Sequence, residues 1–182
     1  MKNILEQLFQ HQRLSRSQAK QTLLEIAEGK HDLAQVAALM TALRMRAISV
    51  DELLGFRSAL LEKCIPVDLE ERIAIDLCGT GGDGKDTFNI STLASIVVAG
   101  AGYGVLKHSN YGLSSHCGSS NVMEYLGYQF SDQASQVLDE FDRVGISFLH
   151  APKFHPAMKL VASTRKGLGV PTFFNMLGPL VN

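Results

Sequence analysis

The residues with the clearest chemical potential form a glycine-rich loop at 79–84, which reads Gly-Thr-Gly-Gly-Asp-Gly after a short apolar run at 73–78. Glycine amides in such a loop can point into one concavity, because no Cβ stands between the backbone and a ligand. The run Asn-Ile-Ser-Thr at 89–92 follows, where we expect a helix to begin. Free N–H groups and a positive dipole at a helix start attract anions. The two stretches together predict a cradle for a phosphate.

Two common nucleotide motifs do not explain this loop. Gly79, Gly81 and Gly84 match G-x-G-x-x-G, but a dinucleotide fold would open a helix directly at the glycines and place an acidic residue about 20 positions later. Here the loop continues to residue 88, and the next expected strand ends in Lys107 and His108. The sequence also lacks G-x-x-x-x-G-K-[ST], so neither an NAD site nor a P-loop is predicted.

Further polar residues stand where an α/β sheet binds its ligands. Lys107 ends an expected strand, and the carboxyl ends of parallel strands are the usual ligand edge. The run 114–120 offers hydroxyls and amides before another helix. Arg165 lies on a later expected helix, where it can receive a carboxylate through two parallel hydrogen bonds. The plainer alternatives remain open: Ser91 as only a helix cap, and Lys107 and Arg165 as solvated cations.

Glycine usage divides the chain into a helical part and an α/β part. Only two of the 16 glycines fall within residues 1–72. Capping signals at Ser15 with Gln18, at Asp32, and at Ser49 with Glu52 predict three helices there. We therefore expect a helical domain at 1–70.

The remainder, 71–182, alternates between strand and helix patterns. Apolar runs at 73–78, 104–108 and 146–151 predict buried parallel strands. Helix patterns cover 91–102, capped by Ser91, then 119–127, 131–145 and 155–169. This alternation predicts an α/β domain with a largely parallel sheet. Because so few strands leave an edge and a face uncovered, we expect this domain to be incomplete at its C-terminus.

Composition excludes several classes of protein. Seventeen Lys and Arg against 18 Asp and Glu give a net charge of −1, which argues against a protein that coats nucleic acid or an anionic membrane. The N-terminus has no signal-peptide core, and the apolar run 96–106 is too short to span a bilayer. We expect a cytoplasmic protein.

Taken in succession, these motifs resemble the anthranilate phosphoribosyltransferase family, which shares its fold with pyrimidine nucleoside phosphorylases. The stretches that carry the resemblance are DLCGTGGDGKDTFNIST, KHSNYGLSSHCGSSNVMEYLG and FHPAMKLVASTRKGLGVPTFFNMLGPLVN. The resemblance implies transfer of the phosphoribosyl group of 5-phosphoribosyl-1-pyrophosphate (PRPP) to the amine of anthranilate, in tryptophan biosynthesis. It also implies Mg²⁺ as cofactor, a homodimer formed through the helical domain, and a helix around Arg165 that packs back toward that domain.

The resemblance also implies roles for particular residues. No side chain is implied as a catalytic acid or base, because the reaction needs alignment and charge stabilisation of the leaving group. Ser91 would reach the magnesium ion. The anthranilate contacts would be Gly79, Asn110 and Arg165, with Arg165 on the carboxylate. The PRPP contacts would be Gly79, Gly82, Asp83, Thr87, Asn89, Ile90, Ser91, Thr92, Lys107, His108, Ser109, Asn110, Tyr111, Gly112, Leu113, Ser114, Ser115 and Ser119.

The chain departs from the family pattern at three places. The usual KHGNR reads Lys-His-Ser-Asn-Tyr at 107–111, so that Ser109 replaces a glycine and Tyr111 replaces a cation. The usual GSAD reads Gly-Ser-Ser-Asn at 118–121. Family chains are also longer, and their downstream Asp-Glu pair, which holds magnesium, has no counterpart before Asn182. We therefore expect this chain alone to bind PRPP weakly or not at all and to turn over poorly. The alternatives are a nucleoside phosphorylase-like paralogue and a non-catalytic relative that binds another ligand.

Overall fold

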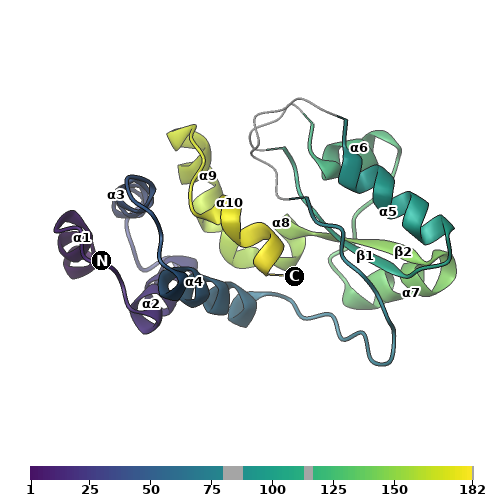
Figure 1. Ribbon diagram of the computed structural model, residues 1–182, viewed down its shortest axis with the longest axis horizontal. Coiled ribbons are helices and arrows are strands. Elements are labelled where there is room, and N and C mark those ends of the chain that lie inside the picture. The colour runs from purple at the N-terminus through teal and green to yellow at the C-terminus, as the bar shows by residue number, and fades with distance from the viewer. Residues whose placement is uncertain (80–87, 113–116, 182) are drawn as a thin grey trace. The chain divides into compact units, whose positions relative to one another are not determined.

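A computed structural model describes residues 1–79, 88–112 and 117–181 (Figure 1). The chain divides into two compact units: the first contains Met1–Cys64 and His155–Val181, and the second contains Ile65–Phe154. The helix that carries Arg165 therefore belongs to the first unit, although it follows the α/β segment in the sequence. None of the described helices combines the length and apolar character that a bilayer span requires.

The first unit is built from helices, and the sequence predicts the starts of three of them, at Ser15, Asp32 and Ser49; the helix at Lys2–Phe9 was not predicted. Its elements are α1 (Lys2–Phe9), α2 (Arg16–Ala27), α3 (Leu33–Arg44), α4 (Val50–Lys63), η1 (Pro156–Met158), α9 (Lys159–Leu168), α10 (Phe174–Leu177) and η2 (Gly178–Leu180). Ser15 and Ser49 each form a complete capping box, and the Asp32 side chain accepts the N–H of Ala34. All three predicted caps are confirmed. These caps satisfy backbone donors that a helix start would otherwise leave unpaired.

An apolar core joins the early helices to the last segment of this unit. Phe56 stacks on Phe173 with ring centroids 4.4 Å apart, and both rings are buried. Gly55 allows α4 to lie close to α2, because a Cβ at this position would stand 2.4 Å from the carbonyl oxygen of Arg16. The core therefore ties 155–181 to the helical bundle and provides a rigid base for α9.

A buried ion pair lies at the start of α4. The Glu52 side chain is fully buried and accepts hydrogen bonds from the Arg46 guanidinium, from the Ser49 N–H and hydroxyl, and from the Leu14 N–H. Burial alone would raise the pKa of Glu52, but these donors outweigh it and lower the pKa to about 2. Glu52 thus links the loops before α2 and α4 through one carboxylate.

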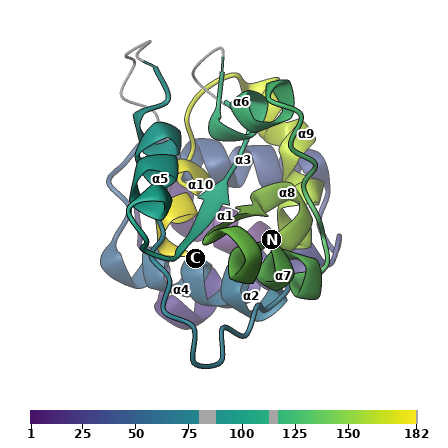
Figure 2. The ribbon, with the colours of Figure 1, turned by 90° about the vertical axis from the view of Figure 1, so that its right-hand side faces the viewer.

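The second unit contains a parallel strand pair with helices on both sides. Its elements are α5 (Ile90–Gly100), β1 (Val105–Ser109), α6 (Ser119–Tyr125), α7 (Ala134–Val144), β2 (Ile146–His150) and α8 (Ala151–Phe154). The strands pair from Val105 opposite Ile146 to Ser109 opposite His150. Figure 2 shows α5 and α7 on opposite sides of the strands. The predicted fold class, a helical domain followed by a parallel α/β domain, is confirmed.

The predicted strand at 73–78 is wrong as a buried strand. Only Ile75 pairs with β1, through a single parallel bridge to Val105, and Ile73 is 88% exposed. The ladder stops there because side chains take over its hydrogen bonds. The Asp76 carboxylate accepts the His108 N–H at 3.0 Å, and the Lys107 ammonium donates to the Leu77 carbonyl at 2.8 Å. These contacts still hold the segment beside β1.

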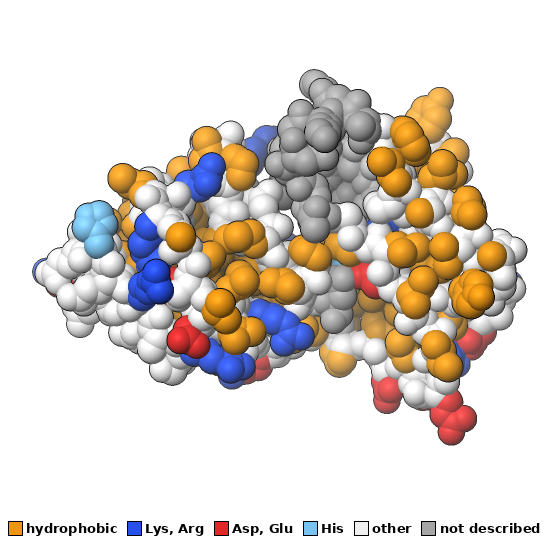
Figure 3. Space-filling model, in the orientation of Figure 1, with side chains coloured by type: hydrophobic (Ala, Val, Ile, Leu, Met, Phe, Trp, Pro, Cys, Tyr) orange, Lys and Arg blue, Asp and Glu red, His pale blue; other side chains and the backbone are white. Residues whose placement is uncertain are grey.

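Only a narrow face of helix α5 is buried, and it consists of small polar residues. Thr92 and Ser95 are buried, whereas Leu93 and Val97 are more than half exposed. Hydrophobic side chains gather over the α5 side of this unit in Figure 3. Small inward residues allow the helix start to approach β1 closely. This brings Ser91 next to the strand.

We predict that Glu52→Gln destabilises the first unit by about 3 kcal/mol, because it leaves the Arg46 guanidinium without its carboxylate. Urea unfolding followed by circular dichroism measures the loss. The matched control is Glu62→Gln, which breaks the partly exposed pair between Lys20 and Glu62 at 2.6 Å. It should cost under about 1 kcal/mol. An equal loss of unfolding free energy in the two variants would contradict a special stabilising role for the buried Glu52.

The same variant has a defined pH dependence. Because the pKa of Glu52 in the folded protein lies below the ordinary 4.5, its stabilising contribution is complete above about pH 4.5 and is lost as the pH falls toward 2. The difference in unfolding free energy between the wild type and Glu52→Gln should therefore narrow on acidification. A constant difference between about pH 6 and about pH 3 would contradict this account.

Candidate functional site

The Lys107 side chain joins three segments, although β1 continues past Lys107 to Ser109 and does not end there as the sequence predicted. It is 1% exposed, and its Nζ donates to the Leu77 carbonyl at 2.8 Å and lies 3.5 Å from the Ser91 hydroxyl. The end of segment 73–79 and the start of α5 thus meet the strand at one ammonium group. Lys107 is a buried cation at the ligand edge of the sheet, not a solvated loop lysine.

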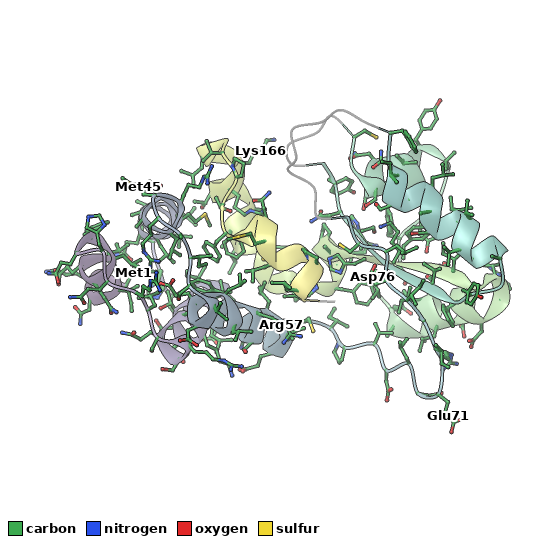
Figure 4. All side chains as sticks on the ribbon, viewed as in Figure 1. Met1, Met45, Arg57, Glu71, Asp76 and Lys166 are labelled. Carbon is green, nitrogen blue, oxygen red and sulfur yellow. The ribbon has the colours of Figure 1, made fainter. Side chains whose placement is uncertain are left out.

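The electrostatics of Lys107 follow from this burial. Desolvation lowers the pKa of Lys107, and nearby Cys78 and Asp76 oppose the shift. Asp76, labelled in Figure 4, bonds to the backbone of the neighbouring His108. A phosphate that arrives beside Lys107 would stabilise its charged form, because an opposite charge offsets the cost of burial.

The start of α5 presents the Ser91 hydroxyl toward the same ammonium. Contrary to the sequence prediction, Ser91 is not the helix cap: α5 begins at Ile90 after Asn89, whose side chain makes no cap hydrogen bond. Ser91 therefore lies inside the first turn, where its hydroxyl reaches toward Lys107. A Cβ on Gly79 would stand 3.1 Å from this hydroxyl, so the chain passes close to it. The Thr92 hydroxyl is buried and has no hydrogen-bond partner among the described residues.

The turn after β1 is held against the start of α6. The Ser119 hydroxyl and the Ser120 N–H donate to the Asn110 carbonyl, at 3.3 and 3.0 Å, and the Asn110 N–H lies 3.2 Å from the Ser119 hydroxyl. The Tyr111 hydroxyl donates to Glu124 at 2.7 Å, and the Tyr111 ring packs edge-on against His150. Tyr111 is thus anchored by α6 and β2. Ser109 lies within β1 with a negative φ, so it carries none of the strain that a left-handed conformation would cause.

Arg165 is a cation without an acidic partner among the described residues of the first unit. Its Nη2 lies 3.4 Å from the Asn175 side-chain oxygen, and its guanidinium stands 5.3 Å from the centre of the Phe174 ring. Burial lowers the pKa of Arg165, although a guanidinium stays charged in proteins. A half-buried guanidinium beside an aromatic ring suits an aromatic carboxylate.

The structure brings part of the predicted site together. Within the second unit, Gly79, Ser91 and Lys107 adjoin one another, and Asn110, Tyr111, Gly112 and Ser119 form the turn at α6. Asn89, Ile90, Thr92, His108 and Ser109 lie in the elements that frame these contacts. Arg165 belongs to the first unit. The predicted residues Gly82, Asp83, Thr87, Leu113, Ser114 and Ser115 lie outside the described residues.

Three residues of this arrangement were missed by sequence reasoning: Asp76, Leu77 and Asn121. The first two are read as part of a strand, and only the tertiary structure places them against Lys107 and His108. Asn121 accepts the N–H groups of both Gly112 and Gly118. Its position three residues after Gly118, at the start of a helix, was the available signal.

The donors for a metal are few. No group of three or more His, Cys, Asp or Glu side chains within 1–79, 88–112 and 117–181 is arranged to hold an ion. Ser91 supplies one neutral hydroxyl oxygen near Lys107. This set fits Mg²⁺ that arrives with a phosphorylated substrate, because Mg²⁺ keeps most of its waters and binds through substrate phosphates.

Comparison with family models matches both parts of the chain. Residues 71–182 match a glycosyl transferase family model described as the a/b domain, and residues 2–64 match the helical bundle domain of the same family. The first match alone covers more than half of the chain.

Curated relatives and solved structures agree with these matches. Anthranilate phosphoribosyltransferases from Flavobacterium psychrophilum and Christiangramia forsetii are 59% and 58% identical over all 182 residues. The chain spans 55% of the length of each. The Thermus thermophilus enzyme has a TM-score of 0.87 at 36% identity, over 98% of this chain and 54% of its own. The Saccharomyces cerevisiae enzyme in complex with PRPP and Mg has a TM-score of 0.88 at 32% identity, with the same coverage.

The matched regions together span nearly the whole chain, although the region matched by the a/b model includes 155–181, which the structure groups with the helical unit. The chain therefore belongs to this glycosyl transferase family, and over its full length it is similar to the anthranilate phosphoribosyltransferases.

Proposed function

We propose that this chain carries the PRPP-binding part of an anthranilate phosphoribosyltransferase. The observation that supports this most is the buried Lys107, which meets the end of segment 73–79 and the start of α5 at the carboxyl edge of the sheet. A buried cation beside a serine hydroxyl at the positive end of a helix forms a site for a pyrophosphate. The yeast structure in complex with PRPP and Mg, which matches 98% of this chain, supports the same ligand.

In the proposed reaction the amine nitrogen of anthranilate forms a bond to C1 of PRPP. The bond between C1 and the pyrophosphate oxygen breaks, pyrophosphate leaves with the electron pair, and the amine loses a proton to solvent water. Lys107 would balance the negative charge that grows on the leaving group, and the Ser91 hydroxyl would orient it. No general base is assigned, because alignment of the substrates and charge stabilisation of the leaving group account for most of the lowering of the activation barrier.

Magnesium would bind together with PRPP, with Ser91 as a protein contact. The ion supplies positive charge to the pyrophosphate oxygens. The remaining protein contributions come from residues 79 and 89–92, which would hold the substrate against β1. Residues 107–112, at the end of β1 and in the turn after it, would complete the PRPP site.

The guanidinium of Arg165, in the first unit, is a suitable partner for the carboxylate of anthranilate, so we propose anthranilate as the acceptor. Arg165 would receive the carboxylate, and Asn110 and Gly79 would contact the same substrate. The Asn110 side-chain oxygen already accepts the Tyr111 N–H at 2.8 Å, so its amide nitrogen is the group left for a ligand. We propose cytoplasmic tryptophan biosynthesis as the setting.

We also propose that the protein dimerises through its helical unit. Apolar side chains of this unit, among them Phe9, Met45 and Val50, are strongly exposed. Burying such residues favours association. Analytical ultracentrifugation should give twice the mass of the chain, with a monomer for the variant Val50→Glu if this face is the interface. A wild-type monomer at high concentration would contradict the proposal.

The central test is calorimetric titration of the chain with PRPP, with and without Mg²⁺. We predict binding that is weak, requires Mg²⁺, and falls at least about tenfold in Lys107→Met, since a hydrogen-bonded charge is lost. Lys153→Met is the matched control, because Lys153 also donates to a carbonyl of the same unit, that of Phe130 at 2.6 Å. Equal losses in both variants would contradict a specific role for Lys107.

A second prediction concerns the acceptor. Arg165→Gln should weaken anthranilate binding at least about tenfold, because a charged partner for the carboxylate is removed, and should leave PRPP affinity unchanged. A fluorescence titration with anthranilate in the presence of PRPP and Mg²⁺ measures this. Arg57→Gln serves as control, since Arg57 donates to the Leu180 carbonyl in the same unit. Unchanged anthranilate affinity in Arg165→Gln would assign the carboxylate elsewhere.

A further inference from the structure

One amide oxygen holds together two parts of the chain at the ligand edge of the second unit. Asn121 Oδ1 accepts the Gly118 N–H at 2.9 Å and the Gly112 N–H at 3.3 Å. Both donors are N–H groups, so the atom that faces them must be an acceptor, which settles the orientation of the amide. A single side chain thus receives one bond from the turn after β1 and one from the start of α6.

Helix capping explains only the first of these bonds. Gly118 is the residue before α6 and Asn121 is the third helical residue, so the bond between them is the side-chain half of a capping box. The bond to Gly112 reaches outside the helix, nine residues back along the chain. Local helix formation does not require it.

The backbone geometry shows how closely the two parts approach. A Cβ on Gly118 would stand 2.2 Å from the Gly112 nitrogen and 2.7 Å from the Asn110 carbonyl oxygen. The turn therefore lies directly on the helix start, and only glycine fits between them. With Gly118 in contact and Asn121 bonded to both sides, the separation of the turn from α6 is held within narrow limits.

We propose that Asn121 is a positioning residue for PRPP. This inference rests on the proposed function, because Asn110 and Gly112 on one side of the contact and Ser119 on the other are PRPP or anthranilate contacts only in that proposal. Asn121 itself touches no substrate in this scheme. It holds the two backbone segments at the spacing at which their groups can contact one ligand together.

The test compares Asn121→Ala with Asn121→Asp in the full chain. Alanine removes the acceptor, whereas a carboxylate of the same shape can still accept both N–H groups. In Asn121→Ala we expect amide hydrogen exchange at Gly112 and Gly118 to accelerate at least about fivefold and the PRPP dissociation constant to rise by a similar factor, the equivalent of about one hydrogen bond. Asn121→Asp should restore both to within about threefold of the wild type.

The matched control is Ser131→Ala, which removes another side-chain contact to the backbone near a helix start of the same unit, the bond from the Gln133 N–H at 2.9 Å. It should lower thermal stability without changing PRPP affinity. The proposal is overturned if Asn121→Ala binds PRPP as the wild type does, if Ser131→Ala weakens binding equally, or if aspartate fails to restore it. Absence of PRPP binding by the folded wild type would instead contradict the proposed function, and with it this role.

Discussion

The buried ammonium of Lys107 is the interaction on which the candidate site depends. A charged lysine is costly to bury unless oxygen atoms receive its hydrogens. The Leu77 carbonyl and the Ser91 hydroxyl lie close enough to do so, and they come from the segment before the glycine loop and from the start of α5. The hydrogen bonds that the buried Lys107 ammonium requires therefore bring the other segments of the site next to β1.

The same need explains why the chain beside β1 is not a regular strand. After the bridge at Ile75, the Asp76 carboxylate and the Lys107 ammonium take over hydrogen bonds that a continuing ladder would use. Side-chain hydrogen bonds beside the site thus replace the regular backbone pairing between this segment and β1. The turn at 110–112 follows a similar rule, since serine and asparagine side chains of α6 replace backbone partners there.

The two units divide the proposed chemistry. The second unit contains the groups suited to a pyrophosphate, and the first contains Arg165, a cation suited to a carboxylate. The apolar core around Phe56 and Phe173 fixes the segment that carries Arg165 within the helical unit.

Local signals in the sequence determined most of the longer helices, the two paired strands and the residue types of the site, but not the helix at Lys2–Phe9. Capping boxes at Ser15 and Ser49 and strand patterns ending at Lys107 act over a few residues, so they can be read without the fold. Whether Ser91 caps α5 and whether 73–78 is a buried strand depended on distant partners, and both predictions were wrong. Asp76 and Asn121 gained their roles only from tertiary contacts, because a hydrogen bond to a backbone group far along the chain leaves no periodic mark in the sequence.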